Sequence, residues 1–140
     1  MATFAPPATE DRKPIRTFRD LKVWEKAFNL AVDVHRLTTG FPREAPPALC
    51  QGLHESSVAM TTHIAQGHTH SYLKDFLRCL DASLAALSDL ETRILLARSL
   101  DLISRENSLK LEERIAEVRR MEWGLVNRLR ARDGTTGARS

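Results

Sequence analysis

The chain has 140 residues, of which 42% are hydrophobic and 28% are charged, and its formal net charge at neutral pH is +3. This length and balance are typical of one globular domain, and they exclude an intrinsically disordered protein. The longest apolar runs fall far short of the roughly 20 residues that a membrane-spanning helix needs. The first residues also lack the regions of a signal peptide, so we expect a cytoplasmic protein with no membrane contact.

The first predicted helix follows a segment, residues 1–17, that shows no periodicity and that we expect to be a flexible arm. The helix should begin at Leu21, with Asp20 as its N-cap, and Gly40 with the proline after Phe41 should end it. Its inner face is predicted from three- and four-residue steps, with smaller side chains widening it: Leu21, Trp24, Phe28, Ala31, His35 and Thr38, with Ala27, Val34 and Leu37.

Two further helices are predicted over residues 48–66 and 71–99. Gly67 should cap the first of them, and Ser71 should be the N-cap of the second. The inner stripe of the first contains many small residues, which allow a neighbouring helix to approach closely. The stripes consist of Leu49, Leu53, Ser56 or Ser57, Met60 and Ile64 in the first helix, and of Phe76, Leu77, Leu80, Leu84, Leu87, Leu90 and Ile94 in the second.

The fourth predicted helix spans residues 105–130, after an N-cap at Ser104. Its core stripe is Leu111, Ile115, Val118, Leu125 and Leu129. A second apolar line runs beside that stripe and suggests a subunit interface, although a tilted helix that buries more of its surface would explain it equally well. The residues of this second line are Leu109, Ala116, Trp123 and Val126.

No segment has the alternation of a strand, and the connections between helices are short. We therefore predict an all-α protein, an up-down-up-down antiparallel four-helix bundle over residues 18–131, with a flexible tail over residues 132–140. The two cysteines, Cys50 and Cys79, lie in separate predicted helices, and in a reducing compartment we expect buried free thiols.

No residue cluster indicates catalysis or a cofactor. His63, His68 and His70 lie close together in the sequence, but their spacing matches no zinc pattern, so we expect exposed histidines or a nucleic-acid contact rather than a metal site. The chain lacks a nucleophile motif, a phosphate loop and the Glu-x-x-His pairs of a di-iron bundle. We therefore predict a protein that is not an enzyme and that binds no cofactor or metal.

Basic residues gather near both ends of the chain, while the middle is close to charge balance. Such rows could contact the phosphates of a nucleic acid, and a merely solvated surface is the alternative. The candidate nucleic-acid-binding residues are Arg16, Arg19, Lys22, Lys26, Lys74, Arg78, Arg119, Arg120 and Arg128.

Several segments resemble a bacterial family of four-helix bundle proteins that includes the 23S rRNA intervening-sequence proteins, also called S23-like. The resemblance rests on the run Phe18-Arg19-Asp20-Leu21-Lys22-Val23-Trp24-Glu25-Lys26-Ala27, on Ile64-Ala65-Gln66-Gly67, on Phe76-Leu77-Arg78 and on Leu90-Glu91-Thr92-Arg93-Ile94-Leu95-Leu96-Ala97. It covers nearly the whole predicted bundle. The turn His68-Thr69-His70 departs from the family, which usually has basic residues there.

Two other segments, 81–87 and 118–126, are similar to a relative of this family, the accessory variability protein of diversity-generating retroelements. That resemblance implies a homopentameric ring and a partner such as a reverse transcriptase with its RNA. Our first hypothesis is a non-enzymatic homo-oligomer that binds RNA or an RNA–protein complex through basic surface rows. The alternative is a protein-interaction scaffold, such as a reverse-transcriptase accessory protein.

Overall fold

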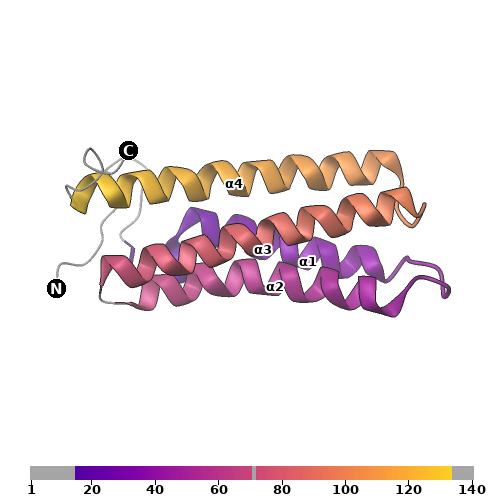
Figure 1. Ribbon diagram of the computed structural model, residues 1–140, viewed down its shortest axis with the longest axis horizontal. Helices are drawn as coiled ribbons and strands as arrows, with labels where there is room; N and C mark the ends of the chain where they lie inside the picture. Colours follow the sequence, from indigo (N-terminus) through magenta and orange to yellow (C-terminus); the bar gives the residue numbers. More distant parts are fainter. Residues whose placement is uncertain (1–14, 71, 134–140) are drawn as a thin grey trace.

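Four long helices make up most of the described chain, residues 15–70 and 72–133 of a computed structural model. They are α1 (Lys22–Thr38), α2 (Pro47–Thr69), α3 (Leu73–Ser99) and α4 (Arg105–Asp133), and a short 3-10 turn, η1 (Phe18–Asp20), precedes α1. These ranges contain no strand. Each helix packs against the next, and α1 also contacts α4, which closes an antiparallel up-down-up-down bundle (Figure 1). The predicted all-α four-helix bundle is confirmed.

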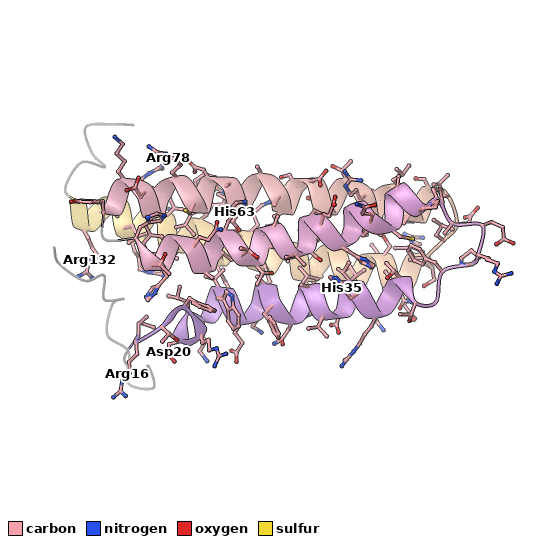
Figure 2. All side chains as sticks on the ribbon, turned by 90° about the horizontal axis from the view of Figure 1, so that it is seen from below. Arg16, Asp20, His35, His63, Arg78 and Arg132 are labelled. Carbon is pink, nitrogen blue, oxygen red and sulfur yellow. The ribbon has the colours of Figure 1, made fainter. Side chains whose placement is uncertain are left out.

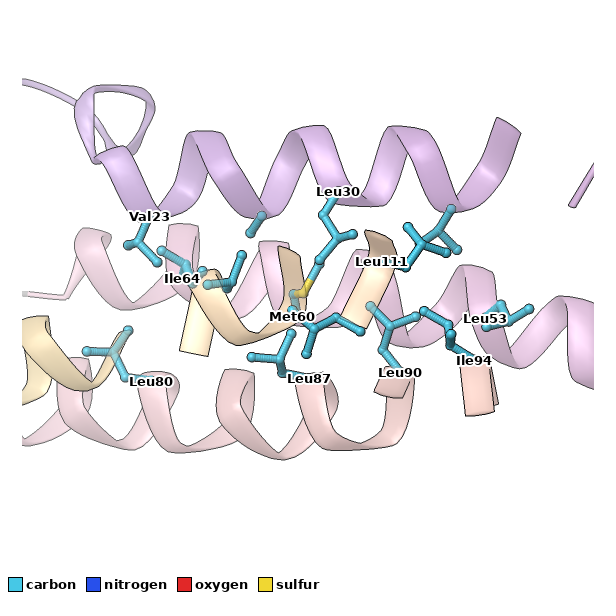
Figure 3. Packing of buried hydrophobic residues seen from close by; sticks show 14 of the residues in the cluster. Val23, Leu30, Leu53, Met60, Ile64, Leu80, Leu87, Leu90, Ile94 and Leu111 are labelled. Atoms are coloured by element: carbon cyan, nitrogen blue, oxygen red, sulfur yellow. The ribbon is translucent and has the colours of Figure 1, made fainter. Parts of the chain in front are cut away.

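The bundle interior is filled by leucine, isoleucine, valine and methionine side chains from all four helices (Figure 3). The predicted core stripes of α2 and α4 are buried along their whole length. On α3, Leu77 and Leu84 are half-buried and the other predicted positions are buried. α3 has 27 residues and is therefore about 40 Å long, which gives the bundle its elongated shape.

The predicted inner face of α1 is confirmed in part: Leu21, Ala27, Ala31 and Val34 are buried, but the centre of the face lies about one position away from the predicted one. The centre of the buried face consists of smaller side chains, Val23, Ala27, Leu30 and Val34. Phe28, predicted as core, is 45% exposed and stacks on Trp24 with 5.0 Å between ring centroids. Both registers have helical spacing, and the smaller residues let α1 approach the core while the aromatic rings lie toward its edge.

Besides α1, which begins at Lys22 rather than Leu21, helix ends differ from the sequence-based predictions at three places. α2 continues through Gly67 to Thr69, so this glycine is an interior helical residue and not a cap. α3 begins at Leu73 after Tyr72, and the predicted N-cap Ser71 lies outside the described residues. α4 extends to Asp133, beyond the predicted domain end at residue 131. The predicted cap at Ser104 is confirmed, since its Oγ accepts a hydrogen bond from the Asn107 amide (3.0 Å).

The remaining predictions about the two chain ends fall mostly outside the described residues. Of the arm expected over residues 1–17, only residues 15–17 are described, and of the tail expected over residues 132–140, only 132 and 133.

Within the described ranges no helix is both long enough and apolar enough to span a bilayer. Cys50 and Cys79 are free thiols as predicted, although both are half-buried rather than buried.

Candidate nucleic-acid interface

The antiparallel topology brings four helix ends together at one end of the bundle. The starts of α1 and α3 lie there beside the ends of α2 and α4 (Figure 1). Arg16, Arg78 and Arg132, which are far apart in the sequence, are found together at this end (Figure 2). We call this region the basic end and define it by the cationic residues Arg16, Arg19, Lys22, Lys74, Arg78, Arg128, Arg130 and Arg132.

A capping box holds the first two arginines of the basic end in place. The Thr17 hydroxyl accepts a hydrogen bond from the Arg19 amide (3.2 Å), and Asp20 Oδ2 accepts from the amides of Arg16 (2.8 Å) and Thr17 (3.1 Å). These backbone hydrogen bonds lower the pKa of Asp20. Asp20 therefore stabilises the turn before α1 and is not the N-cap of α1 that the sequence suggested; that position is Leu21, which has no side-chain cap.

The start of α3 supplies a second basic row. Lys74 and Arg78 are both exposed, and their spacing of four residues places them on one side of the helix. Arg78 Nη1 lies 3.5 Å from Asp75 Oδ1, but the Arg78 side chain remains 69% exposed. An ion pair this open contributes little to stability and leaves the guanidinium accessible to a phosphate.

Two of the predicted cations are already paired with carboxylates on neighbouring helices. Lys26 Nζ lies 3.5 Å from Glu117 Oε2, which joins α1 to α4. Arg119 Nη2 lies 2.8 Å from Glu91 Oε1, which joins α4 to α3. Both are at mid-bundle, so their main role is in holding helices together. Arg120 is exposed beside them, and Arg128 is half-buried nearer the basic end.

The opposite end of the bundle carries a mixture of charges instead. Its cationic and anionic side chains are close to balance: Arg36, Arg43, Arg98, Arg105 and Lys110 against Glu44, Glu55, Asp101, Glu106 and Glu112. One of these pairs is an ion pair, Arg98 Nη1 to Glu112 Oε2 at 3.6 Å. An anionic partner would therefore be attracted to one end of the molecule rather than to both.

The three clustered histidines have separate surroundings. His63 is within hydrogen-bonding distance of Gln66 Oε1 (Nδ1 at 3.0 Å), and His68 packs edge-on against Phe76. Burial lowers the pKa of His68, and the nearby Asp20 carboxylate partly opposes that effect. Within the described ranges no three His, Cys, Asp or Glu side chains are grouped closely enough to hold a metal ion.

A stacked pair of histidines joins α1 to α2. The rings of His35 and His54 stack with 4.2 Å between centroids, and His54 Nε2 lies 2.8 Å from Thr38 Oγ1. The Thr38 hydroxyl donates to the His35 carbonyl oxygen (2.8 Å), so it accepts the proton of His54 Nε2. Burial and the neighbouring His35 lower the pKa of His54. The lowered pKa favours a neutral imidazole at His54, and the stacked rings connect two helices.

Glu122 is an unexpected buried acid on α4. Its side chain is fully buried, and neither carboxyl oxygen has a hydrogen-bond partner among the described residues. The nearby Ser83 hydroxyl donates to the Met60 carbonyl oxygen (2.8 Å). Burial raises the pKa of Glu122 to about 8, while Ser83 and Arg119 act in the opposite direction. The carboxyl group is therefore largely protonated at neutral pH.

Apolar side chains are exposed on two sides of the bundle. On α4, Leu109, Ala116 and Trp123 recur at seven-residue steps, with Leu109 and Trp123 exposed and Ala116 half-buried. Glu112 and Arg119 form ion pairs with α3, and each lies three or four residues from residues of this line. The line therefore adjoins α3. On the α1–α2 side, Phe28 and Val58 are exposed. The fourth residue predicted for the interface, Val126, is fully buried in the core, so it cannot contribute to an external surface.

A protein-family model described as "23S rRNA-intervening sequence protein" matches residues 19–124. The chain belongs to this family. The match begins in η1 and ends in α4, so it includes all four helices of the bundle. The family resemblance inferred from sequence is therefore confirmed.

A solved structure has the same fold as this member of the 23S rRNA-intervening sequence protein family. It is a protein of unknown function from the S23 ribosomal protein family of Bacteroides thetaiotaomicron, with a TM-score of 0.68 and 15% sequence identity. The similarity covers 74% of this chain and 97% of the other. No curated protein matches the chain.

Two of the segments that resembled the family meet in the structure. A Cβ atom at Gly67 would lie 2.8 Å from Phe76 Cδ1, so the end of Ile64–Gly67 contacts the start of Phe76–Arg78. This part of the motif therefore serves helix packing. Three residues at the basic end are not among the candidates predicted from the sequence: Arg130, Arg132 and Tyr72, which precedes α3 and is 68% exposed. The available signal for Tyr72 was its position two residues before Lys74.

Proposed function

We propose that this protein is a non-enzymatic, cytoplasmic RNA-binding protein that holds RNA at the basic end of its bundle. The supporting observation is the gathering of eight cations from three separate segments at one end, while charges at the other end nearly balance. The name of the family refers to an intervening sequence of 23S rRNA, which favours RNA as the anionic partner.

The described acidic side chains near the basic end, Asp20, Glu25 and Asp75, are fewer than its eight cations. Asp20 accepts two backbone hydrogen bonds, and Asp75 is engaged by Arg78. Exposed guanidinium and ammonium groups without base-directed geometry would contact phosphates and sugar rather than read a sequence. We therefore expect RNA affinity to decrease steeply as salt increases, because binding releases counterions.

The test is fluorescence anisotropy with a labelled RNA hairpin over a series of salt concentrations. We expect the double variant K74E/R78E to weaken binding about 10-fold or more at low salt and to reduce the salt dependence. The matched control, R36E/R43E, changes two exposed arginines at the opposite end and should bind almost like wild type. A wild-type protein without salt-dependent RNA affinity, or equal losses in the two variants, would contradict the proposal.

We further propose that copies of this protein assemble into a closed ring, with a pentamer as the expected size. The apolar line Leu109, Ala116 and Trp123 lies on the α3 side of α4, whereas the exposed Phe28 and Val58 lie on the other pair of helices. Two different apolar surfaces on opposite sides of a subunit suit a head-to-tail contact, which closes into a ring when the rotation allows it. A ring would also multiply the number of basic ends that face one RNA.

A protein-interaction scaffold, with a partner such as a reverse transcriptase, is the second candidate. The observation that favours it is a pair of exposed leucines, Leu96 on α3 and Leu100 directly after it, which are not part of either apolar surface assigned to the ring. Affinity purification with and without RNase separates the two functions. A protein partner retained after RNase treatment favours the scaffold, and loss of all partners favours RNA binding.

A further inference from the structure

We propose that Tyr72 stacks on an unpaired base, so that the basic end prefers single-stranded RNA or a loop over a regular duplex. This inference rests on the proposed RNA binding and adds the class of RNA. Tyr72 is the only tyrosine of the chain and, with 68% of its surface exposed, the most exposed large hydrophobic residue described. It lies immediately before α3, two residues from Lys74.

The other described aromatic residues are engaged in packing or lie away from the basic end. Trp24 contacts Phe18 edge-to-face and stacks on Phe28, with 5.0 Å between ring centroids in each pair. Phe76 is buried against His68. The side chain of Tyr72 makes no hydrogen bond or ring contact with another described residue. With respect to the described residues, its ring is therefore open to a planar ligand.

The charges around Tyr72 select the kind of planar ligand. Lys74 and Arg78 are exposed on the same helix, and Arg132 comes from the neighbouring α4 at the same end (Figure 2). An exposed ring beside phosphate-binding cations is the arrangement by which proteins hold single-stranded nucleic acid, since phosphates meet the cations while a base stacks on the ring. In a duplex the bases are stacked on one another and their faces are not available.

The experiment compares three RNAs of equal length with the full-length protein: a single strand, the corresponding blunt duplex, and the same single strand with abasic sites. The variants are Tyr72→Ala, Tyr72→Phe and, as a control at the opposite end, Leu100→Ala. Thermal melts verify that each variant is folded, which we expect because both side chains are largely exposed. Affinity is measured by fluorescence anisotropy at several salt concentrations.

We expect Tyr72→Ala to weaken binding of the intact single strand by about 5-fold to 100-fold. Tyr72→Phe should retain the affinity, because the ring remains, and Leu100→Ala should behave as wild type. The abasic strand and the duplex should not distinguish Tyr72→Ala from wild type. The salt dependence should also be unchanged in Tyr72→Ala, because no charge is removed, whereas Lys74→Ala should lower its slope by about 1.

Two results would overturn the inference and leave the proposed function intact: RNA binding that is insensitive to Tyr72→Ala, or an equal loss on all three RNAs. Loss of a protein partner without any loss of RNA affinity would also overturn it and would assign Tyr72 to a protein contact. If the wild-type protein binds none of the three RNAs, the proposed function fails together with this inference.

Discussion

At the scale of single residues, Glu122 is an ionisable side chain that lies in the core of the bundle. Its side chain is fully buried on α4, and its carboxyl oxygens have no hydrogen-bond partner among the described residues. Burying a carboxylate without compensation costs free energy, and protonation reduces that cost. Because the pKa of Glu122 is about 8 in the folded protein and near 4.5 when unfolded, the folded state retains a proton that the unfolded state has lost.

We predict that the free energy of unfolding decreases as the pH rises from about 4.5 to about 8, because over this range Glu122 is ionised in the unfolded chain but still protonated in the folded protein. The variant Glu122→Met should remove this decrease and gain about 2 kcal/mol or more relative to wild type at about pH 9. Urea titrations at about pH 6 and pH 9 measure the effect. Glu113→Met, an exposed control on the same helix, should preserve the wild-type decrease; a Glu122→Met variant with the wild-type pH profile would contradict the prediction.

At the scale of the elements, α2 and α3 form the most extensive helix pair of the bundle. The small buried residues on α2, among them Gly52, Ser56 and Gly67, allow this close approach. At Gly67 a Cβ atom would lie 2.8 Å from the Phe76 ring and 3.1 Å from Cys79 Cβ. At Gly124 on α4, the nearest atom would be Arg128 Nη1 at 3.4 Å. Gly67 therefore has no space for a methyl group without movement of its neighbours, whereas Gly124 has that space.

We predict that Gly67→Ala destabilises the protein by about 1 kcal/mol, because overpacking against Phe76 outweighs the gain in helix propensity. Gly124→Ala should stabilise it by up to about 1 kcal/mol, since the same gain comes with no close contact. Urea denaturation of both variants beside wild type measures these differences. Equal shifts in the two variants would mean that Phe76 does not limit the space at Gly67.

At the scale of the whole molecule, the cations of the basic end and the exposed apolar side chains of the proposed ring contacts lie on different surfaces. The basic end carries its cations on three segments, while the apolar line of α4 and the Phe28–Val58 side lie along the length of the bundle. A ring built through the sides would therefore keep the basic ends accessible. Trp123 is the largest member of the line and is 43% exposed, so it is the residue expected to contribute most to the contact.

We predict that Trp123→Glu converts the assembly to monomers, because a charge buried in an apolar interface is left unpaired. Leu109→Glu on the same line should have the same effect, and Leu100→Glu, an exposed leucine outside it, should not. Native mass spectrometry reports the subunit number of each variant, and circular dichroism verifies the helices. A wild-type protein that is monomeric at micromolar concentration would contradict the ring.

The periodicity of the sequence was sufficient to predict the fold class and the number of helices, because apolar residues at helical spacing must be buried together. Positions such as Leu53, Leu90 and Ile115 were predicted as core and are fully buried. The register within α1 could not be predicted in the same way, since Trp24 and Phe28 also have helical spacing. The packing of α1 against α2 decided that smaller side chains take the centre.

For the candidate site, the sequence alone indicated the family and six of the eight cations of the basic end, all but Arg130 and Arg132. Which cations share one surface was decided by the antiparallel topology, which brings the starts of α1 and α3 to the end of α4. The tertiary structure also decided that Lys26 and Arg119 form ion pairs, that Val126 is buried and that Tyr72 is exposed. The physical reason is that local pattern specifies each helix, whereas charge pairing and exposure depend on which helices become neighbours.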